Sequence, residues 1–254
     1  MIVEDLVLEI TRKCNLSCRH CLRGPAQRLT MSTQVLNNTL MHISHIGMVT
    51  FTGGEPSLAT EVIEQFVQTC WWRHISVGSF FMYTNGKAHN GLGRFIRACD
   101  KLYGLCDEQG ACAVSISQDQ YHRELRDIQW HRYEIRDEET GYSYGEYPPY
   151  FHHTPKENYI DQPFNEGRAQ TNGLGWKPPR QQKPFEVEDH NGELYIKNDD
   201  GQVFIAANGN VVSTCNLSFH RVDKESKGNV LTTPLSQIIE SYCVREEEIA
   251  TAVA

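Results

Sequence analysis

The sequence predicts an α/β protein built on a parallel sheet, and three observations support that fold class. Over residues 1–120, short β-like runs alternate with longer runs whose apolar residues have helical spacing. Cysteine, glycine and polar motifs follow the ends of the β-like runs. Hydrophobic residues make up 39% of the 254 residues, which is enough for a packed core. Periodicity alone does not separate an open sheet from a barrel.

The predicted elements alternate along the N-terminal half. Predicted strands span residues 6–10, 48–52, 80–84 and 113–117. Predicted helices span residues 32–45, 61–72 and 91–105. In the first helix, Val35, Leu36 and Leu40 supply apolar positions at helical spacing. This alternation predicts parallel strands joined by right-handed crossovers, with the chemistry gathered at the carboxyl ends of the strands.

The C-terminal half predicts a different organisation. Residues 142–184 are rich in Pro, Gly, Tyr and His, which predicts a lid or an irregular segment. Strand-like runs then cover residues 193–197, 203–206 and 211–214. Hairpin turns are expected at residues 198–201 and 207–210. Thr233-Pro234 predicts the start of a helix over residues 235–247. We therefore expect a core at residues 1–184 and an extension at residues 185–254.

Charge and composition argue against several classes of protein. The 24 Lys and Arg residues are outnumbered by 32 Asp and Glu residues, so the formal net charge of −8 counts against duplex nucleic acid as a partner. No run approaches the ~18 apolar residues of a membrane helix. The first residues carry acids where a signal peptide carries lysine or arginine. These features predict a cytoplasmic protein without a membrane partner.

Three of the nine cysteines, Cys14, Cys18 and Cys21, form a CxxxCxxC cluster after the first predicted strand. Three thiolates on one tight loop can hold three irons of a [4Fe–4S] cube, which leaves the fourth iron open to a small molecule. Structural zinc usually takes four ligands in two CxxC-like pairs, so the loop fits zinc less well. A zinc site and a chance spacing remain as alternatives. The other six cysteines are scattered, as small buried hydrophobes are.

The order and spacing of these motifs resemble the radical SAM superfamily. Its signature is a CxxxCxxC loop after a first strand, as at residues 14–21. Its second motif is similar to Gly53-Gly54-Glu55-Pro56, and a Thr84-Asn85-Gly86 motif after the third strand is frequent there. The resemblance implies a partial (β/α)6 barrel. It also implies one [4Fe–4S] cluster on the three cysteines, with S-adenosylmethionine (AdoMet) chelating the open iron.

The resemblance implies roles for the residues around the second motif. Gly53 and Gly54 lack a Cβ, so the backbone there can approach a ligand closely. The carboxylate of Glu55 is expected to pair with the AdoMet ammonium group, and Pro56 to stiffen the turn. His20 stands where the family has an aromatic residue near the adenine. An ordinary turn after a buried strand is the alternative for the glycine motif.

Further polar residues follow the third and fourth strands. Ser115, Ser117 and Asp119 are expected to contact the ribose hydroxyls or the methionine carboxylate, or else Asp119 caps the next helix. Asn85 serves either the site or a turn. Arg168 belongs to a Gly-Arg-Ala step that is similar to one in SPASM-type radical SAM proteins, and it is expected to pair with a carboxylate or to lie in solvent.

The C-terminal region resembles a degenerate SPASM/Twitch extension. In that family the extension holds auxiliary iron–sulfur clusters with four or more cysteines. Only Cys215 and Cys243 are present here, and two thiolates cannot complete such a site. We therefore expect the scaffold of the extension without an auxiliary cluster.

The resemblance implies an oxygen-sensitive radical SAM enzyme that cleaves AdoMet reductively to a 5′-deoxyadenosyl radical, which abstracts hydrogen from a substrate. A one-electron donor of the flavodoxin or ferredoxin type is implied. The SPASM-like tail favours a peptide or protein side chain as substrate, with a nucleotide, modified nucleobase or small metabolite as the alternative. Two other classes stay open: a non-catalytic zinc-binding module, and an electron carrier with a complete fourth ligand.

Overall fold

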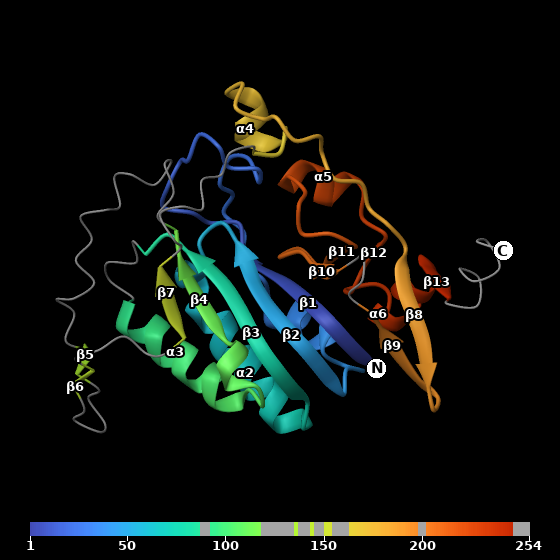
Figure 1. Ribbon diagram of the computed structural model, residues 1–254. Coiled ribbons are helices and arrows are strands. Elements are labelled where there is room, and N and C mark those ends of the chain that lie inside the picture. Colours follow the sequence, from blue (N-terminus) through green and yellow to red (C-terminus); the bar gives the residue numbers. More distant parts are fainter. Residues whose placement is uncertain are drawn as a thin grey trace.

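The structure is a computed structural model, and it describes residues 1–86, 92–117, 135–136, 143–144, 150–153, 163–197 and 202–245. Its centre is a parallel sheet in which β1 to β4 follow the chain order and β7 lies beside β4 (Figure 1). These strands are β1 (Ile2–Thr11), β2 (His45–Gly53), β3 (Ser76–Thr84), β4 (Ala113–Ile116) and β7 (Phe151–His153). Among the described residues, the two end strands of the sheet do not pair with each other. The predicted α/β class is confirmed, and the sheet is open rather than closed.

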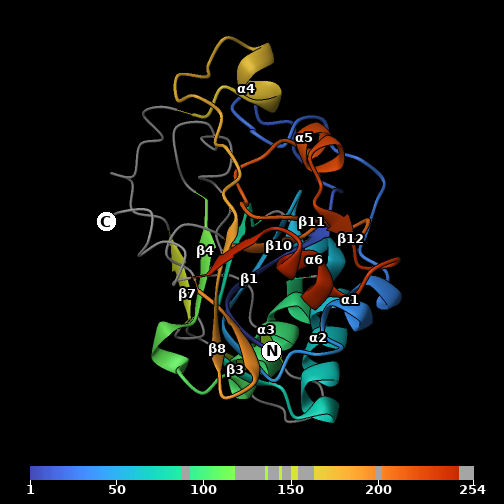
Figure 2. The same ribbon diagram turned by 90° about the vertical axis from the view of Figure 1, so that its right-hand side faces the viewer.

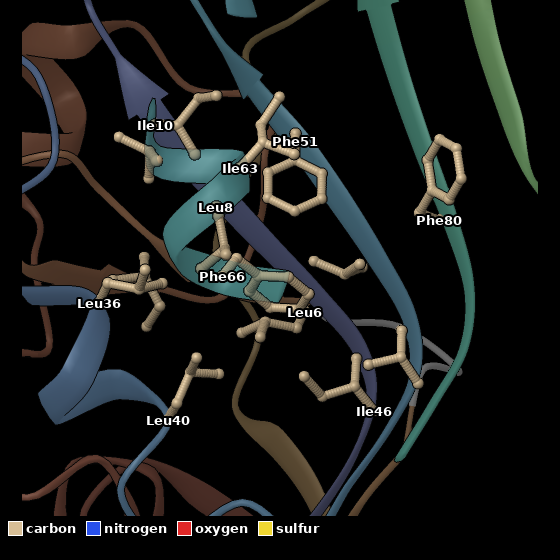
Figure 3. Close-up of a cluster of buried hydrophobic side chains, with 14 of the residues drawn as sticks. Leu6, Leu8, Ile10, Leu36, Leu40, Ile46, Phe51, Ile63, Phe66 and Phe80 are labelled. Atoms are coloured by element: carbon tan, nitrogen blue, oxygen red, sulfur yellow. The ribbon is translucent and has the colours of Figure 1, made fainter. Parts of the chain in front are cut away.

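Three helices connect the central strands and form one core with them. They are α1 (Thr33–Thr39), α2 (Thr60–Arg73) and α3 (Leu92–Leu105), and a short 3-10 turn, η2 (Gln109–Ala111), precedes β4. Figure 3 shows side chains of β1, α1 and α2 in a single apolar cluster. The rings of Phe51 and Phe66 meet edge to face there, with centroids 5.2 Å apart. This core holds the strand ends in fixed register.

Register brings the carboxyl ends of the strands to one rim. Leu8 of β1 lies opposite Phe51 of β2, which in turn lies opposite Met82 of β3. Thr84 at the end of β3 lies opposite Ile116 at the end of β4. The segments that follow these strands therefore start side by side, as the alternating pattern predicts.

The C-terminal strands continue the same sheet beyond β1. β10 (Val203–Ile205) and β9 (Glu193–Ile196) both pair parallel with β1, at different points along it. The predicted hairpin between these two strands is therefore wrong, although its turn residues 198–201 lie outside the described part of the chain. Strand β11 (Asn210–Val212) does form the second predicted hairpin with β10, and β12 (Gly228–Asn229) pairs with β11.

A hairpin that the sequence analysis missed joins β8 (Phe185–His190) to β9. Its turn is Asn191-Gly192, and both residues have positive φ (58° and 84°), as a type I′ turn requires. The other edge of β8 pairs with β13 (Cys243–Arg245), so helix α6 (Leu235–Glu240) ends earlier than the predicted residue 247. Pairing with an open strand edge overrides helical spacing here. Helix α1 likewise ends at Thr39, before the predicted residue 45.

The remaining elements lie before, within or after the predicted irregular segment. β5 (Ile135–Arg136) pairs with β6 (Ser143–Tyr144), and two short helices follow, α4 (Gly167–Thr171) and α5 (Phe219–Lys224). Figure 2 shows α4 and α5 at the same end of the molecule. Much of residues 142–184 lies outside the described residues, so the lid stays a prediction. No helix in the described part of the chain is both long and apolar enough to cross a membrane.

Candidate active site

The cysteine loop covers residues 12–29 and is closed at its base by backbone hydrogen bonds. The Arg12 N–H donates to the Leu29 carbonyl, and the Gln27 N–H donates to the Arg12 carbonyl (2.9 Å each). Cys14, Cys18 and Cys21 are partly buried and form no disulfide. The closed base fixes both ends of the loop, so the three thiols are carried by a defined segment at the end of β1.

All three thiols line one cavity of about 420 Å³. Burial raises the pKa of the Cys14 thiol to about 11, against the hydrogen bond from the Leu16 N–H, which lowers it. Binding of a metal cluster therefore has to displace a proton from this thiol. A cavity of this size falls within the range of small-molecule and cofactor sites.

The thiols suit a cluster better than a single ion. Within the described residues, no group of three or more His, Cys, Asp or Glu side chains is arranged to hold one metal ion. A [4Fe–4S] cube takes each cysteine on a different iron, so its ligands need to share a cavity wall without meeting at one point. A structural zinc ion needs its ligands to converge on a single centre at about 2.3 Å. Three thiols lining one cavity are the number of ligands that a three-cysteine cluster requires.

The glycine motif packs against the cysteine loop. The Gly54 N–H donates to the Thr11 carbonyl and the Glu55 N–H to the Lys13 carbonyl (2.8 Å each). A Cβ on Gly53, whose φ is +141°, would lie 1.9 Å from the Thr11 carbonyl oxygen. The close backbone approach expected for a ligand is made here by the base of the cysteine loop. Gly54 lines the cavity, and Gly53 does not.

Glu55 ties the ends of β2 and β3 together at the cavity wall. It is 1% exposed, and its carboxylate accepts hydrogen bonds from the Ser57 hydroxyl (2.6 Å), the Thr84 hydroxyl (2.5 Å) and the Asn85 N–H (2.8 Å). Burial raises the pKa of Glu55, and these hydrogen bonds oppose that shift. All of these donors are neutral, so among the described residues no cation neutralises this carboxylate. Pro56, the first residue of η1 (Pro56–Ala59), is buried and lies outside the cavity wall.

Of the predicted site residues at the ends of β3 and β4, some line the cavity and others do not. The Asn85 side-chain amide donates to Asn15 of the cysteine loop at 2.9 Å, and Asn85 lines the cavity. Ser117 also lines it, held by a 2.9 Å bond from its N–H to the Thr84 carbonyl. Ser115 does not line the cavity, and Asp119 lies outside the described residues.

The Gly-Arg-Ala step forms the first turn of α4 and contacts the cysteine loop directly. The Arg168 N–H donates to the Cys21 carbonyl at 2.8 Å. Gly167 has φ +54°, and a Cβ there would lie 2.2 Å from the Leu22 carbonyl oxygen. Arg168 lines the cavity, and its Nε is buried without a hydrogen-bond partner among the described residues. His20 lines the same cavity, and its place near the adenine stays a prediction.

A buried charge network at the base of the loop escaped the sequence analysis. Arg12 is 1% exposed and donates to Glu9 (2.6 Å) and, through two parallel bonds of 2.8 Å, to Asp223 of α5. The Ala207 N–H also donates to Glu9 at 3.1 Å. Burial raises the pKa of Glu9, and the charges of Arg23 and Arg12 offset part of that shift. The network joins β1, the cysteine loop and the C-terminal region.

The neighbouring Arg23 reinforces this junction. Its guanidinium donates to the Leu217 carbonyl at 2.9 Å and lies over the Phe204 ring, 5.2 Å from the centroid. The Phe219 N–H donates back to the Arg23 carbonyl at 3.0 Å. The only signal in the sequence was Arg12 beside the cysteine motif. Its acidic partner, Asp223, is 211 residues away along the chain.

Comparison with known proteins gives short sequence matches and distant structural ones. No family model matches the chain. A stretch of 71 residues is 30% identical to an uncharacterized protein of Methanocaldococcus jannaschii and covers 27% of this chain and 25% of that protein. A stretch of 77 residues is 31% identical to GTP 3′,8-cyclase of Rhodococcus opacus and covers 27% of this chain and 22% of that protein. The matches thus span about a quarter of the length of these curated relatives.

Among solved structures, anSMEcpe with bound AdoMet is similar with a TM-score of 0.48 and 14% identity, over 95% of this chain and 85% of that chain. The same protein with AdoMet and the Kp18Cys peptide gives 0.49 and 15%, over 97% and 85%. Streptococcus suis SuiB bound to the precursor peptide SuiA gives 0.45 and 11%, over 94% and 64%. Because these TM-scores are below 0.5, the interpretation of the site depends on this chain's own residues. The cysteine-lined cavity is the observation from this chain on which the proposal below is based.

Proposed function

We propose that the protein is a radical SAM enzyme that binds a [4Fe–4S] cluster through Cys14, Cys18 and Cys21. One observation carries this proposal: the three loop thiols line a single cavity together with Glu55 and Arg168. When bound, such a cluster supplies the electron that cleaves AdoMet reductively, and the 5′-deoxyadenosyl radical so formed takes a hydrogen atom from the substrate.

The chain's own residues bind and orient the cofactor. Glu55 offers a buried carboxylate without a cationic partner among the described residues, so we assign the AdoMet ammonium group to it. Arg168 and Ser117 face the same cavity and suit the methionine carboxylate or the ribose hydroxyls. His20 is assigned to the adenine side. Asn85 holds the cysteine loop against the end of β3 through its bond to Asn15.

We propose a peptide or protein side chain as the substrate. The cavity has about the volume of one cofactor-sized ligand, so a substrate approaches from outside it. Tyr83, in the cavity wall, is 57% exposed and gives that approach an aromatic contact surface. The match to GTP 3′,8-cyclase favours a nucleotide as the second candidate. Residues 185–254 are proposed as a SPASM/Twitch-like extension.

The test of this function is AdoMet cleavage by reconstituted protein. Anaerobically reconstituted chain, reduced with dithionite, is expected to release 5′-deoxyadenosine, and the true substrate class should accelerate that release. Peptide mixtures and GTP are compared in parallel arms. Absence of 5′-deoxyadenosine from protein with a full cluster would contradict the proposal.

The Glu55→Gln change is expected to weaken AdoMet binding about tenfold, because it removes the charge that pairs with the ammonium group. Equilibrium dialysis with AdoMet measures the affinity, while cluster absorbance and the melting temperature report cluster content and folding. Glu64→Gln is the matched control, since Glu64 pairs with Arg94 on the surface of the helical layer. Unchanged AdoMet affinity in Glu55→Gln would remove this assignment.

Cys215 and Cys243 are expected to bind no cluster. Cys215 packs beside the small apolar cluster that contains Val7 and Phe204, and neither cysteine lines the cavity. Replacing either residue with alanine should therefore leave the iron content per chain unchanged. Loss of several irons in either variant, measured by iron and sulfide analysis, would show that a second cluster exists.

A further inference from the structure

The positive charge of the chain is concentrated in three segments around the cysteine loop. Residues 10–30, 163–184 and 214–227, here called the basic cap, contain twelve of the 24 Lys and Arg residues but three of the 32 Asp and Glu residues. No acid occurs in the sequence between Glu9 and Glu55. A chain with a net charge of −8 therefore carries a strongly cationic end.

The three segments of the basic cap meet in space. The Arg168 N–H bonds to Cys21, and the Phe219 N–H bonds to Arg23, so both later segments dock on the cysteine loop. The Ser218 N–H donates to Glu166 at 2.6 Å and joins the later segments to each other. Figure 1 shows α4, α5 and the blue loop that follows β1 at the same end of the molecule.

The acids of the basic cap are already paired within it. Asp223 binds Arg12, whereas Glu166 and Glu225 both bind Arg221. Six exposed cations form no ion pair with the described residues. They are Lys13, Arg19, Arg28, Lys177, Arg180 and Lys224. The surface therefore presents uncompensated positive charge to solvent.

We propose that the basic cap is the docking surface for an acidic one-electron carrier protein, an inference that rests on the proposed function. Three of the exposed cations, Lys13, Arg19 and Arg28, lie on the loop that carries the cysteines, yet none of them lines the cavity. They face a partner outside the cavity rather than a substrate within it. A carrier bound there would lie against the same loop that carries the three cysteines.

The electron balance of this step is simple. The reduced carrier loses one electron and the enzyme's cluster gains one, with no bond or proton transferred. Opposite charge on two protein surfaces accelerates their encounter by about 10- to 1,000-fold at low ionic strength, and salt removes that gain. Uncompensated cations on the outer side of a cysteine loop supply such a field.

The test compares two charge-reversed variants with equal change in net charge. Arg19→Glu/Arg28→Glu alters the basic cap, and Arg97→Glu/Lys101→Glu alters exposed residues of α3 in the helical layer. Stopped-flow absorbance follows cluster reduction in each reconstituted protein by reduced flavodoxin, at low and high salt. Reduced methyl viologen, a small cationic reductant, reports whether the cluster itself stays reducible.

The basic-cap variant is expected to react with flavodoxin about tenfold more slowly at low salt, with a weaker salt dependence. Its rate with methyl viologen should not fall, and the α3 variant should match the wild type. Equal flavodoxin rates in all three proteins would overturn the docking inference alone. Wild-type protein that methyl viologen reduces but that forms no 5′-deoxyadenosine would overturn the proposed function and, with it, the carrier.

Discussion

Replacing Cys14, Cys18 or Cys21 with alanine is expected to abolish both cluster retention and 5′-deoxyadenosine formation. In the proposed site each thiol would hold one iron of the cube, and two remaining thiols on this loop would leave too few ligands to retain it. Iron and sulfide per chain and the release of 5′-deoxyadenosine are measured after anaerobic reconstitution. The expected change is from about four irons per chain to a background level.

A matched control separates ligation from general damage. Cys70 is a fully buried thiol of α2 in the main core and does not line the cavity. Cys70→Ala should keep the full iron content while lowering stability slightly. Loop variants that retain both iron and AdoMet cleavage would show that the cysteines are not the ligands.

Replacing Arg12 with methionine is expected to lower the free energy of unfolding by about 3 kcal/mol or more, because it leaves Glu9 as a buried carboxylate that has lost its closest cation. Urea unfolding of the apo protein measures the loss. Arg94→Met is the control, since Arg94 forms an exposed pair with Glu64 and should change stability by less than about 1 kcal/mol. A loss no larger than that of the control would remove the structural role of the network.

The same variant should show a characteristic pH dependence. Burial already raises the pKa of Glu9, so its favourable contribution is complete at low pH and is lost as pH rises through the folded-state pKa. Removal of Arg12 raises that pKa further, with only the charge of Arg23 and the hydrogen bond from the Ala207 N–H left to lower it. The stability deficit of Arg12→Met should therefore shrink as pH falls from 7 to 5. In the wild type, burial raises the pKa of Asp223, but the hydrogen bonds and charge of Arg12, together with hydrogen bonds from Asn208 and Asn210, outweigh burial and hold this pKa below its usual range.

Local patterns in the sequence were sufficient to predict the central strands of the fold. Three of the four predicted strands lie within β1, β2 and β3, and the fourth ends one residue beyond β4. The prediction succeeds because runs of β-branched and aromatic residues between helices favour strands. The strands that were missed, such as β7 and β13, have three residues each and exist only through pairing with a neighbour. Such short segments carry no periodicity of their own.

The candidate site was predictable to the same degree. Motifs placed Cys14, Glu55 and Asn85 at strand ends, and register then brings them to one cavity. The Arg12–Asp223 pair was not predictable, because its partners meet only after the C-terminal segment has docked. The role of Gly53 also differs from expectation: its missing Cβ makes room for the Thr11 carbonyl, a contact within the protein that no motif specifies.

The most direct measurement of the central claim is electron paramagnetic resonance of the reduced, reconstituted protein, with and without AdoMet, combined with iron counting. We expect about four irons per chain and a spectrum that changes when AdoMet binds, because in the proposed site one iron would have no protein ligand. One zinc ion per chain, or a cluster spectrum indifferent to AdoMet because a fourth side chain completes its ligation, would contradict it.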